Sequence, residues 1–304
     1  MARRRRGLPI DGVLLLDKPR GVSSNHALQR VRRLFQAQKA GHTGTLDPMA
    51  TGLLPVCFGE ATKFSSYLLE ADKVYRTYVR LGEITDSGDA DGELIERRPV
   101  PTLETADIER VLVDFRGEIE QVPPMYSALK HQGKPLYQLA REGKTIARAP
   151  RRVTVYDMRL VGREPTGFEL EVACSKGTYI RTLAEEIGAA LGCGAHISVL
   201  RRLKTGPFQA ADMFDFAALE AESEAARREQ VLLPTDVLVA HLPRLDVDDA
   251  TAQRVLNGQR ARFDTTGLSN DGGPVRLYRD AAFLGLVAVT AAGEIAPRRL
   301  VATA

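Results

Sequence analysis

The sequence predicts an α+β protein with one large domain and a small β-rich module at its C-terminal end. A chain of 304 residues suits this division better than a single compact core. Helical and strand patterns are mixed throughout the chain. From 242 to 304, short strand patterns and glycines surround one helical stretch, Asp248–Leu256, which indicates the small module.

Composition excludes several classes of protein. Hydrophobic residues make up 44% of the chain and charged residues 27%, so a wholly disordered chain is excluded. No stretch approaches the roughly 20 apolar residues of a membrane helix, and the basic start MARRRRG leads into no long apolar segment. Three cysteines without a CxxC pair fit a reducing compartment. We therefore expect a cytoplasmic protein with no membrane partner.

The N-terminal elements begin with a strand, a turn and a helix. The run GVLLLDKP predicts a buried strand that ends at Pro19, and Ser23 or Ser24 predicts the cap of a helix through about Phe35. The stretch Gly41–Pro55 has three glycines and two prolines but no sustained period, which predicts a loop of defined shape. The next expected elements are a helix over 61–69, a strand over 73–81, an acidic turn over 85–92 and a helix over 105–115.

The central part of the chain contains a basic, proline-rich segment, Pro123–Pro150, which predicts an exposed insertion with a short helix at 136–141. The core sheet is expected to continue on its far side. The expected elements there are strands over 152–161 and 168–175, a helix over 179–191, a strand over 196–203 and an acidic helical stretch over 214–229.

Clustered basic residues predict a polyanionic partner. From Lys130 to Arg152 there are seven Lys or Arg against one acidic residue. Arg3–Arg6, Gln29–Arg33 and Arg201–Lys204 form three further clusters. Each cluster alone is also consistent with a solvated face, whereas the four together favour nucleic acid.

Three motifs that would predict a bound nucleotide or metal ion are absent or incomplete in the sequence. The chain has no GxxxxGK[ST] motif and no strand-linked GxGxxG. The turn Ser87–Gly92 resembles a calcium loop, but the alignment would place Arg98 at the bidentate position. Cys193 and His196 have metal-like spacing without a second pair, so a packed cysteine beside a hydrogen-bonded histidine is the favoured interpretation. The sequence predicts no metal.

The loop around Asp47 is the strongest candidate for chemistry. A loop aspartate is commonly a cap or turn residue. Here Pro48 favours an extended backbone at Asp47, and the apolar neighbours Leu46, Met49, Leu53 and Leu54 would hold the loop against the body. A carboxylate in such surroundings needs a cation. A paired carboxylate in a rigid loop is suited to nucleophilic or charge-stabilising catalysis.

At this loop the chain resembles the pseudouridine synthases, specifically the bacterial tRNA pseudouridine-55 synthases, over about residues 8 to 300. The motifs that carry the resemblance are KPRGVSS (18–24), GHTGTLDPMATGLLPV (41–56), KVYRTYVRLG (73–82), TDSGDADG (85–92), SKGTYIRTLAEEIG (175–188) and VLRRLKTGPF (199–208). The resemblance implies the pseudouridine synthase fold, with a mixed, mainly antiparallel central sheet. It also implies isomerisation of one uridine in the T-loop of tRNA without a cofactor.

The resemblance assigns roles residue by residue. Asp47 would be the catalytic carboxylate, acting by attack on the ribose, by attack on the base or by a glycal route, and Arg181 would be its ion-pair partner. The remaining implied positions are Tyr75 stacking on the base, Tyr179 near the flipped nucleotide, Leu200 as an apolar wall, His42 entering the T-loop, and Lys18 and Pro19 in the pocket wall. From pattern alone, Tyr75 and Tyr179 are core residues, Arg181 is an exposed helix residue and His42 packs in its loop. Asp86, Asp89 and Asp91 match a family turn without an assigned role.

The resemblance also implies how the RNA is held. The expected domains are a catalytic domain over 8–240, with a basic RNA-clamping insertion at about 124–152, and a PUA-like RNA-binding domain over 241–304. Lys130, Arg148, Arg151 and Arg152 are the expected contacts to the RNA backbone. Because the target base is stacked in the T-loop, the T-arm of tRNA must present it by base flipping. We expect a monomer that needs no guide RNA.

Three competing functions remain at this stage. A tRNA-binding or tRNA-folding protein could keep the fold without catalysis, although the set Asp47, Tyr75 and Arg181 argues against it. A uracil-releasing hydrolase would usually need two cooperating carboxylates, and none accompanies Asp47 in its loop. A guide-dependent member of the same superfamily would be expected to carry a long C-terminal extension.

Overall fold

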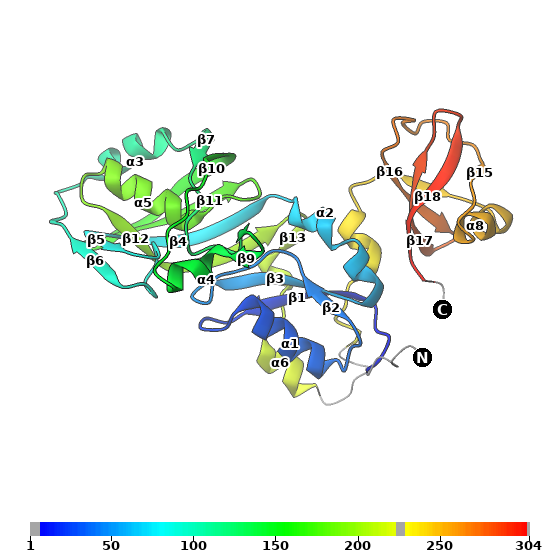
Figure 1. The fold of residues 1–304 in the computed structure, drawn as a ribbon, viewed down its shortest axis with the longest axis horizontal. Coiled ribbons are helices and arrows are strands. Elements are labelled where there is room, and N and C mark those ends of the chain that lie inside the picture. Colours follow the sequence, from blue (N-terminus) through cyan, green and yellow to red (C-terminus); the bar gives the residue numbers. More distant parts are fainter. Residues whose placement is uncertain (1–6, 223–228, 303–304) are drawn as a thin grey trace.

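A nine-stranded mixed sheet forms the centre of the computed structural model, which describes residues 7–222 and 229–302 (Figure 1). Every pairing in this sheet is antiparallel except that between β3 and β12, which confirms the predicted mixed, mainly antiparallel sheet. In spatial order its strands are β1 (Gly12–Lys18), β3 (Thr51–Phe58), β12 (Ala195–Thr205), β4 (Lys73–Leu81), β11 (Gly167–Cys174), β10 (Arg151–Glu164) and β7 (Gly117–Gln121), with β2 (Ala40–His42) beside β3 and β13 (Phe208–Gln209) beside β12.

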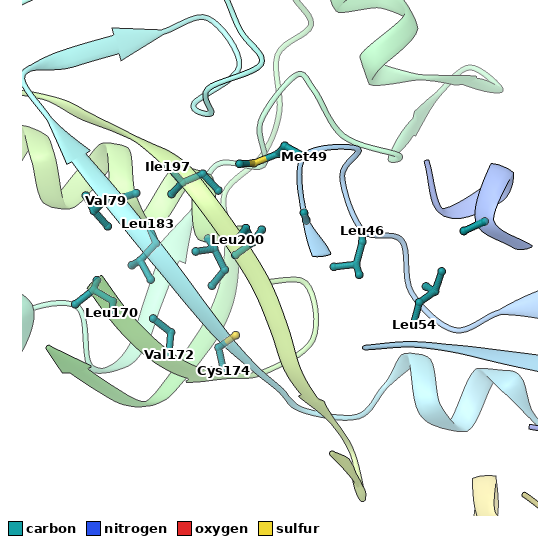
Figure 2. Packing of buried hydrophobic residues seen from close by; sticks show 14 of the residues in the cluster. Leu46, Met49, Leu54, Val79, Leu170, Val172, Cys174, Leu183, Ile197 and Leu200 are labelled. Atoms are coloured by element: carbon teal, nitrogen blue, oxygen red, sulfur yellow. The ribbon is translucent and has the colours of Figure 1, made fainter. Parts of the chain in front are cut away.

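Helices and short hairpins surround the sheet. The buried side chains of α1 (Ser24–Leu34), α3 (Thr105–Val113) and α5 (Ile180–Ala190) join those of the strands in one hydrophobic cluster. Figure 2 shows how this cluster extends from the Asp47 loop, through Leu46, Met49 and Leu54, to Leu170 and Val172 on the sheet. The smaller elements are α2 (Ser65–Leu69), α4 (Leu136–Arg141), α6 (Phe216–Ala221), the hairpin β5 (Glu83–Thr85) with β6 (Leu94–Arg97), the hairpin β8 (Lys130–His131) with β9 (Lys134–Pro135), and 3-10 turns at Gly59–Lys63, Ala210–Asp212 and Thr235–Val239.

The C-terminal module has its own sheet and its own hydrophobic cluster. Its elements are β14 (Arg244–Asp246), β16 (Pro274–Arg279), β17 (Ala282–Val289), β18 (Glu294–Leu300), β15 (Ala261–Arg262) and the helix α8 (Asp249–Leu256). The module contacts the large domain where the Phe283 and Phe64 rings lie 5.4 Å apart. Lys63 adds a hydrogen bond from its Nζ to the Leu300 carbonyl at 2.9 Å.

Several local predictions are confirmed. Ser23 caps α1 by accepting a hydrogen bond from the His26 amide. The predicted strand over 73–81 coincides with β4, and the predicted helix over 136–141 coincides with α4. His196 Nδ1 donates a hydrogen bond to the Glu83 carbonyl at 3.0 Å and Cys193 is buried, as expected for a packed cysteine beside a hydrogen-bonded histidine.

The prediction of one loop over Gly41–Pro55 is wrong at both ends, because β2 continues to His42 and β3 begins at Thr51. On one edge, β3 pairs first with β12 and then with β2, and Pro55 lies between these two stretches. Because no strand of the described residues pairs with that edge at Pro55, the missing amide hydrogen of proline is tolerated there. The predicted helix over 61–69 is instead a 3-10 turn and the short helix α2. Phe64 separates them with a non-helical backbone, and its ring packs on Phe283.

Neither β6 nor β7 has a counterpart in the predictions. All of β6 is exposed and most of β7 is exposed, so neither carries a clear apolar alternation. The acidic stretch over 214–229 contains α6, and its residues 223–228 lie outside the described residues, as does the cluster Arg3–Arg6. No helix in the described ranges is long and apolar enough to cross a membrane.

The junction between β3 and β12 places the Asp47 loop on the sheet. Gly52 pairs in parallel with Arg202, at the residue where the chain leaves the loop. Its φ is +97°, and a Cβ there would lie 2.4 Å from the Arg202 carbonyl oxygen. Glycine is therefore required at this position, both for its backbone angle and for the close approach of the strands.

Candidate active site

The loop between β2 and β3 holds Asp47 in a fixed position. The Ser24 hydroxyl donates to the Leu46 carbonyl at 2.9 Å and accepts from the Leu46 amide at 2.8 Å. The Asp47 carbonyl accepts from the Ala50 amide at 3.1 Å. The apolar neighbours Leu46, Met49, Leu53 and Leu54 are all buried, as the sequence predicted. The loop is thus anchored on both sides of the aspartate.

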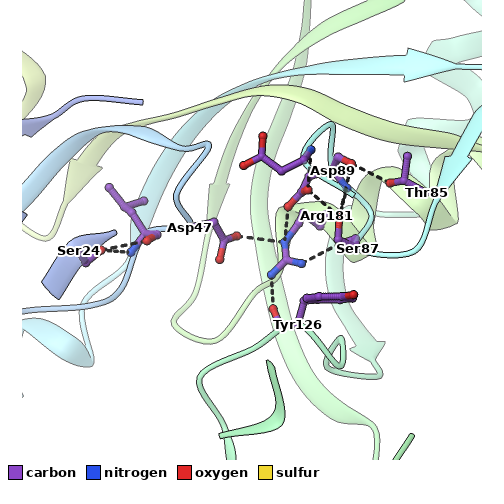
Figure 3. A network of polar contacts seen from close by, with 9 residues as sticks. Ser24, Asp47, Thr85, Ser87, Asp89, Tyr126 and Arg181 are labelled. Carbon is purple, nitrogen blue, oxygen red and sulfur yellow. Dashed lines mark hydrogen bonds and ion pairs between the residues drawn. The ribbon is translucent and has the colours of Figure 1, made fainter. Parts of the chain in front are cut away.

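Arg181, in the first turn of α5, is the cation that faces Asp47. Its side chain is only 3% exposed, and its Nε lies 3.0 Å from Asp47 Oδ2 (Figure 3). Its two terminal nitrogens donate to the Ser87 carbonyl at 2.7 Å and to the Tyr126 carbonyl at 2.5 Å. The exposed-helix interpretation of Arg181 is therefore wrong, because every nitrogen of the guanidinium has a partner.

Asp89 is a second carboxylate beside Arg181 and had no role in the sequence interpretation. Its Oδ2 lies 3.7 Å from Arg181 Nε, and its Oδ1 accepts from the Ser87 hydroxyl at 2.6 Å and from the Asp91 amide at 3.1 Å. The turn motif around it was visible in the sequence. By contrast, Ser87 and Tyr126 contact Arg181 through main-chain oxygens, which no residue type reveals. A cation at a helix N-terminus is electrostatically unfavourable, and these acceptors offset that cost.

The protonation of Asp47 reflects opposing influences. Desolvation raises the pKa of the carboxyl above its ordinary value, whereas the charge of Arg181 opposes this rise. The Asp47 side chain is 34% exposed, so its free edge reaches the neighbouring cavity. The arrangement offers an oriented carboxylate, held by one arginine, to a ligand in that cavity.

The cavity beside Asp47 measures about 330 Å³ and brings together most of the predicted site residues. Tyr75 comes from β4, Tyr179 immediately precedes α5, and Leu200 lies on β12. Burial raises the pKa of both tyrosine hydroxyls, which favours their neutral forms. Two aromatic rings and a leucine next to an ionised carboxylate suit a planar ligand that reacts at its edge.

His42 lies apart from this cavity. It lines a second cavity of about 780 Å³, which Asp47 and Arg181 also line. Burial and the charge of Arg202 lower the pKa of His42, so its ring is neutral at neutral pH. The acidic residues Asp86, Asp89 and Asp91 line the same cavity.

Neither Lys18 nor Pro19 lines either of the two cavities, and their place in the pocket wall stays a prediction. Lys18 is fully buried, and its Nζ donates to the carbonyls of Val22 at 2.6 Å, Pro19 at 3.0 Å and Pro48 at 3.3 Å. Desolvation lowers the pKa of its ammonium to about 8. Lys18 therefore ties the turn after β1 to the Asp47 loop.

The basic clusters have different environments. Lys130, Arg151 and Arg152 are exposed, Arg148 is half-buried, and none of the four forms an ion pair with the described residues. The cluster Arg201–Lys204, by contrast, is no free basic patch. Arg201 pairs with Asp17 at 2.6 Å, and Arg202 is 1% exposed. Within residues 7–222 and 229–302, no group of three His, Cys, Asp or Glu side chains could hold a metal.

Family models match nearly the whole chain. Residues 32–180 match the N-terminal domain of TruB family pseudouridylate synthase, and residues 181–240 match the tRNA pseudouridylate synthase B C-terminal domain. Residues 243–301 match the C-terminal model of pseudouridine synthase II TruB.

Comparison with named relatives identifies the same family. The chain is 70% identical to tRNA pseudouridine synthase B of Chromohalobacter salexigens over 100% of this chain and 98% of that protein. It is 54% identical to the protein of the same name from Azoarcus sp., over 97% and 96% of the two chains. Among solved structures, a chain of a Cbf5-Nop10-Gar1 complex is 28% identical with a TM-score of 0.69, over 92% of this chain and 78% of that one.

Proposed function

The chain belongs to the TruB family of pseudouridylate synthases and is an isomerase, and we propose that its substrate is uridine 55 in the T-loop of tRNA. The observation that supports this substrate best is the Asp47–Arg181 pair at 3.0 Å, at the edge of a cavity that contains Tyr75, Tyr179 and Leu200. A uracil ring between these side chains would present its glycosidic bond to the carboxylate. The named relatives act on tRNA, and the basic insertion supports the same substrate.

The reaction breaks the bond between ribose C1′ and base N1 and joins C1′ to C5 of the same base. The hydrogen of C5 leaves to water, and no cofactor is needed. Asp47 is the catalytic carboxylate, whether it attacks the ribose, attacks the base or accepts the 2′ proton on a glycal route. Each route requires the ionised carboxylate, which Arg181 stabilises and orients.

Access to the base requires flipping. A stacked uridine hides both its glycosidic bond and C5, and unstacking costs a few kcal/mol. Stacking on Tyr75 and phosphate contacts offset this cost. His42, which lines the second cavity, would enter the T-loop as the base leaves it.

RNA binding is assigned to the basic insertion and to the C-terminal module. We propose that 8–240 is the catalytic domain and that 241–304 is a PUA-like RNA-binding domain. Lys130, Arg148, Arg151 and Arg152 would contact phosphates, because no carboxylate among the described residues neutralises them. The start of the insertion also borders the active site, since Ser127 lines both cavities.

Neutralising the insertion is expected to change the salt dependence of binding. Replacing Arg148, Arg151 and Arg152 together with glutamine should flatten the slope of log K against log salt by about 0.7 to 0.9 per lost phosphate contact. The measurement is tRNA affinity between low and moderate salt. Arg159→Gln is the matched control, because Arg159 lies on the same strand β10 and already pairs with Glu171. An unchanged slope in the triple variant would remove these residues from the interface.

The rate of the reaction is expected to fall on the acid side at a higher pH than an ordinary aspartate would give. Because burial raises the pKa of Asp47 above 3.8, its inactive neutral form persists to a higher pH. Single-turnover rates from about pH 8 down to about pH 4 measure this limb. Binding is followed at each pH, so that loss of affinity is separated from loss of chemistry. A rate that is still above half its maximum at about pH 4 would contradict the expectation.

The proposed function is tested with a tRNA transcript whose uridines carry tritium at C5. Release of about one equivalent of tritium per tRNA, with the base retained, supports isomerisation at one site. Free uracil would instead identify a hydrolase. Binding without release from the well-folded chain would favour a binding protein or dependence on a guide RNA.

A further inference from the structure

The side chain of Arg202 is a buried cation that forms no ion pair with the described residues. Its side chain is 1% exposed, and no carboxylate of the described residues lies within ion-pair distance of it. Its Nε donates to the Leu53 carbonyl at 2.7 Å and its Nη2 to the Gly44 carbonyl at 3.2 Å. The two other arginines of this region differ, because Arg181 faces Asp47 and Asp89 and Arg201 pairs with Asp17.

This uncompensated charge borders the active-site cavity. Arg202 lines the cavity together with Asp47 and Tyr75, and its residue on β12 is paired with Tyr75 on β4. The guanidinium reaches the Tyr75 hydroxyl, and its positive charge lowers the pKa of Lys18, His42 and Lys73 as well. The other titratable groups that act on Tyr75 are Cys174 on β11 and Asp47 in its loop.

A buried charge without a counter-charge is costly. The penalty for removing an ion from water is several kcal/mol, and two carbonyl dipoles offset only part of it. Arg202 supports the structure through its hydrogen bonds to the Leu53 and Gly44 carbonyls, which need a donor but no net charge. The charge of Arg202 is therefore available to any negative charge that develops in the cavity.

On the premise of the proposed function, we propose that Arg202 acts through the Tyr75 hydroxyl to stabilise the uracil anion that forms when the glycosidic bond breaks. Both electrons of the C1′–N1 bond stay with the base, whose negative charge spreads over N1, O2 and O4. C1′ completes its valence either by a bond to an Asp47 oxygen or by a double bond to C2′, which forms when the 2′ proton passes to Asp47. When C5 then bonds to C1′, the bond from C1′ to the Asp47 oxygen breaks, or on the glycal route Asp47 returns the 2′ proton. The C5 proton leaves to water and N1 takes up a proton from water, so the net composition is unchanged.

The donor pattern explains why Arg202 is a positioning residue. A guanidinium has donors only, so toward Arg202 the phenolic oxygen of Tyr75 can act only as an acceptor, and the phenolic hydrogen is directed elsewhere. Arg202 thereby fixes the Tyr75 ring against the face of the base, and its guanidinium holds a positive charge beside the cavity in which the base becomes negative. Preorganised charges of this kind stabilise developing charge at low reorganisation cost.

The test compares two leaving groups. Arg202→Met and Arg202→Gln are assayed in single turnover on tRNA that carries either uridine or 5-fluorouridine at the target position, with nucleosides separated after digestion. Fluorine stabilises the base anion by itself. We expect Arg202→Met to slow conversion of uridine on the order of 10²-fold but conversion of 5-fluorouridine by about tenfold or less. tRNA affinity should stay within about twofold.

The controls separate charge from structure. Arg201→Met removes the neighbouring arginine, which is 36% exposed and paired, and should leave the ratio of the two rates unchanged. Arg202→Gln removes the charge but keeps a hydrogen-bond donor near the Leu53 and Gly44 carbonyls. If Arg202→Met does not fold, the two rates are compared in Arg202→Gln instead. Equal losses on both substrates, or no loss, would overturn the inference. An inactive wild-type chain would overturn the proposed function and this inference together.

Discussion

Replacing Asp47 with asparagine is expected to abolish pseudouridine formation while leaving tRNA binding nearly intact. The amide has the size of the carboxylate, but it is neutral and a poor nucleophile, so none of the three routes remains open. Loss of an essential nucleophile or base costs about 10⁴-fold or more in rate. Tritium release in single turnover, measured beside the dissociation constant for tRNA, separates the two effects.

The fold should survive this change, because Arg181 keeps three other acceptors. These are the Ser87 and Tyr126 carbonyls and the carboxylate of Asp89. Asp91→Asn is the matched control, since Asp91 is an exposed acid that lines only the second cavity. Turnover near the wild-type rate in Asp47→Asn would remove Asp47 from the chemistry.

Local pattern predicted the elements whose two faces differ most. β11 alternates buried with half-buried residues, β4 alternates buried with more exposed residues from Thr77 onward, and α5 is amphipathic, so their positions could be predicted closely. β3 was missed because its residues 52–58 are buried on both faces and include Gly52 and Pro55. A uniformly apolar run next to a loop motif does not show where the loop ends.

The resemblance named Asp47 and Arg181, and the structure places them 3.0 Å apart. Their wider surroundings depend on segments that are distant in the chain. Arg181 contacts turn 85–92 and the insertion through main-chain oxygens, which leave no trace in residue type. The role of Lys18 was also hidden, because its three acceptors are carbonyls.

Arg202 could have been found from the sequence. The cluster Arg201–Lys204 resembles a solvated basic patch when only its number of positive charges is considered. On a strand, however, alternate residues share a face, and Arg202 is two residues from Leu200, which was already assigned to the pocket wall. The structure confirms that the two residues lie on the same face of the strand, since Leu200 and Arg202 both line the cavity.

Arg181→Met is expected to damage stability and catalysis together. It leaves the carboxylates of Asp47 and Asp89 facing each other without their cation, and it removes the donors to two carbonyls. Removing one partner of a buried pair costs about 3 to 5 kcal/mol, at the lower end here because Asp47 is one-third exposed. This corresponds to a fall in Tm of about 5 to 10 °C for a chain of this size. The rate should fall by about 10³-fold, because Asp47 loses both its charge partner and its orientation.

A second variant distinguishes the two losses. In Arg181→Met/Asp89→Asn the repulsion between the carboxylates is gone, so part of the lost Tm should return. The rate should not return, because Asp47 still lacks the guanidinium that holds it ionised. Arg159→Met, at an exposed arginine, should leave Tm within about 1 °C. Recovery of the rate in the double variant would mean that Arg181 serves only to neutralise Asp89, and Asp47 would then need no cation to act.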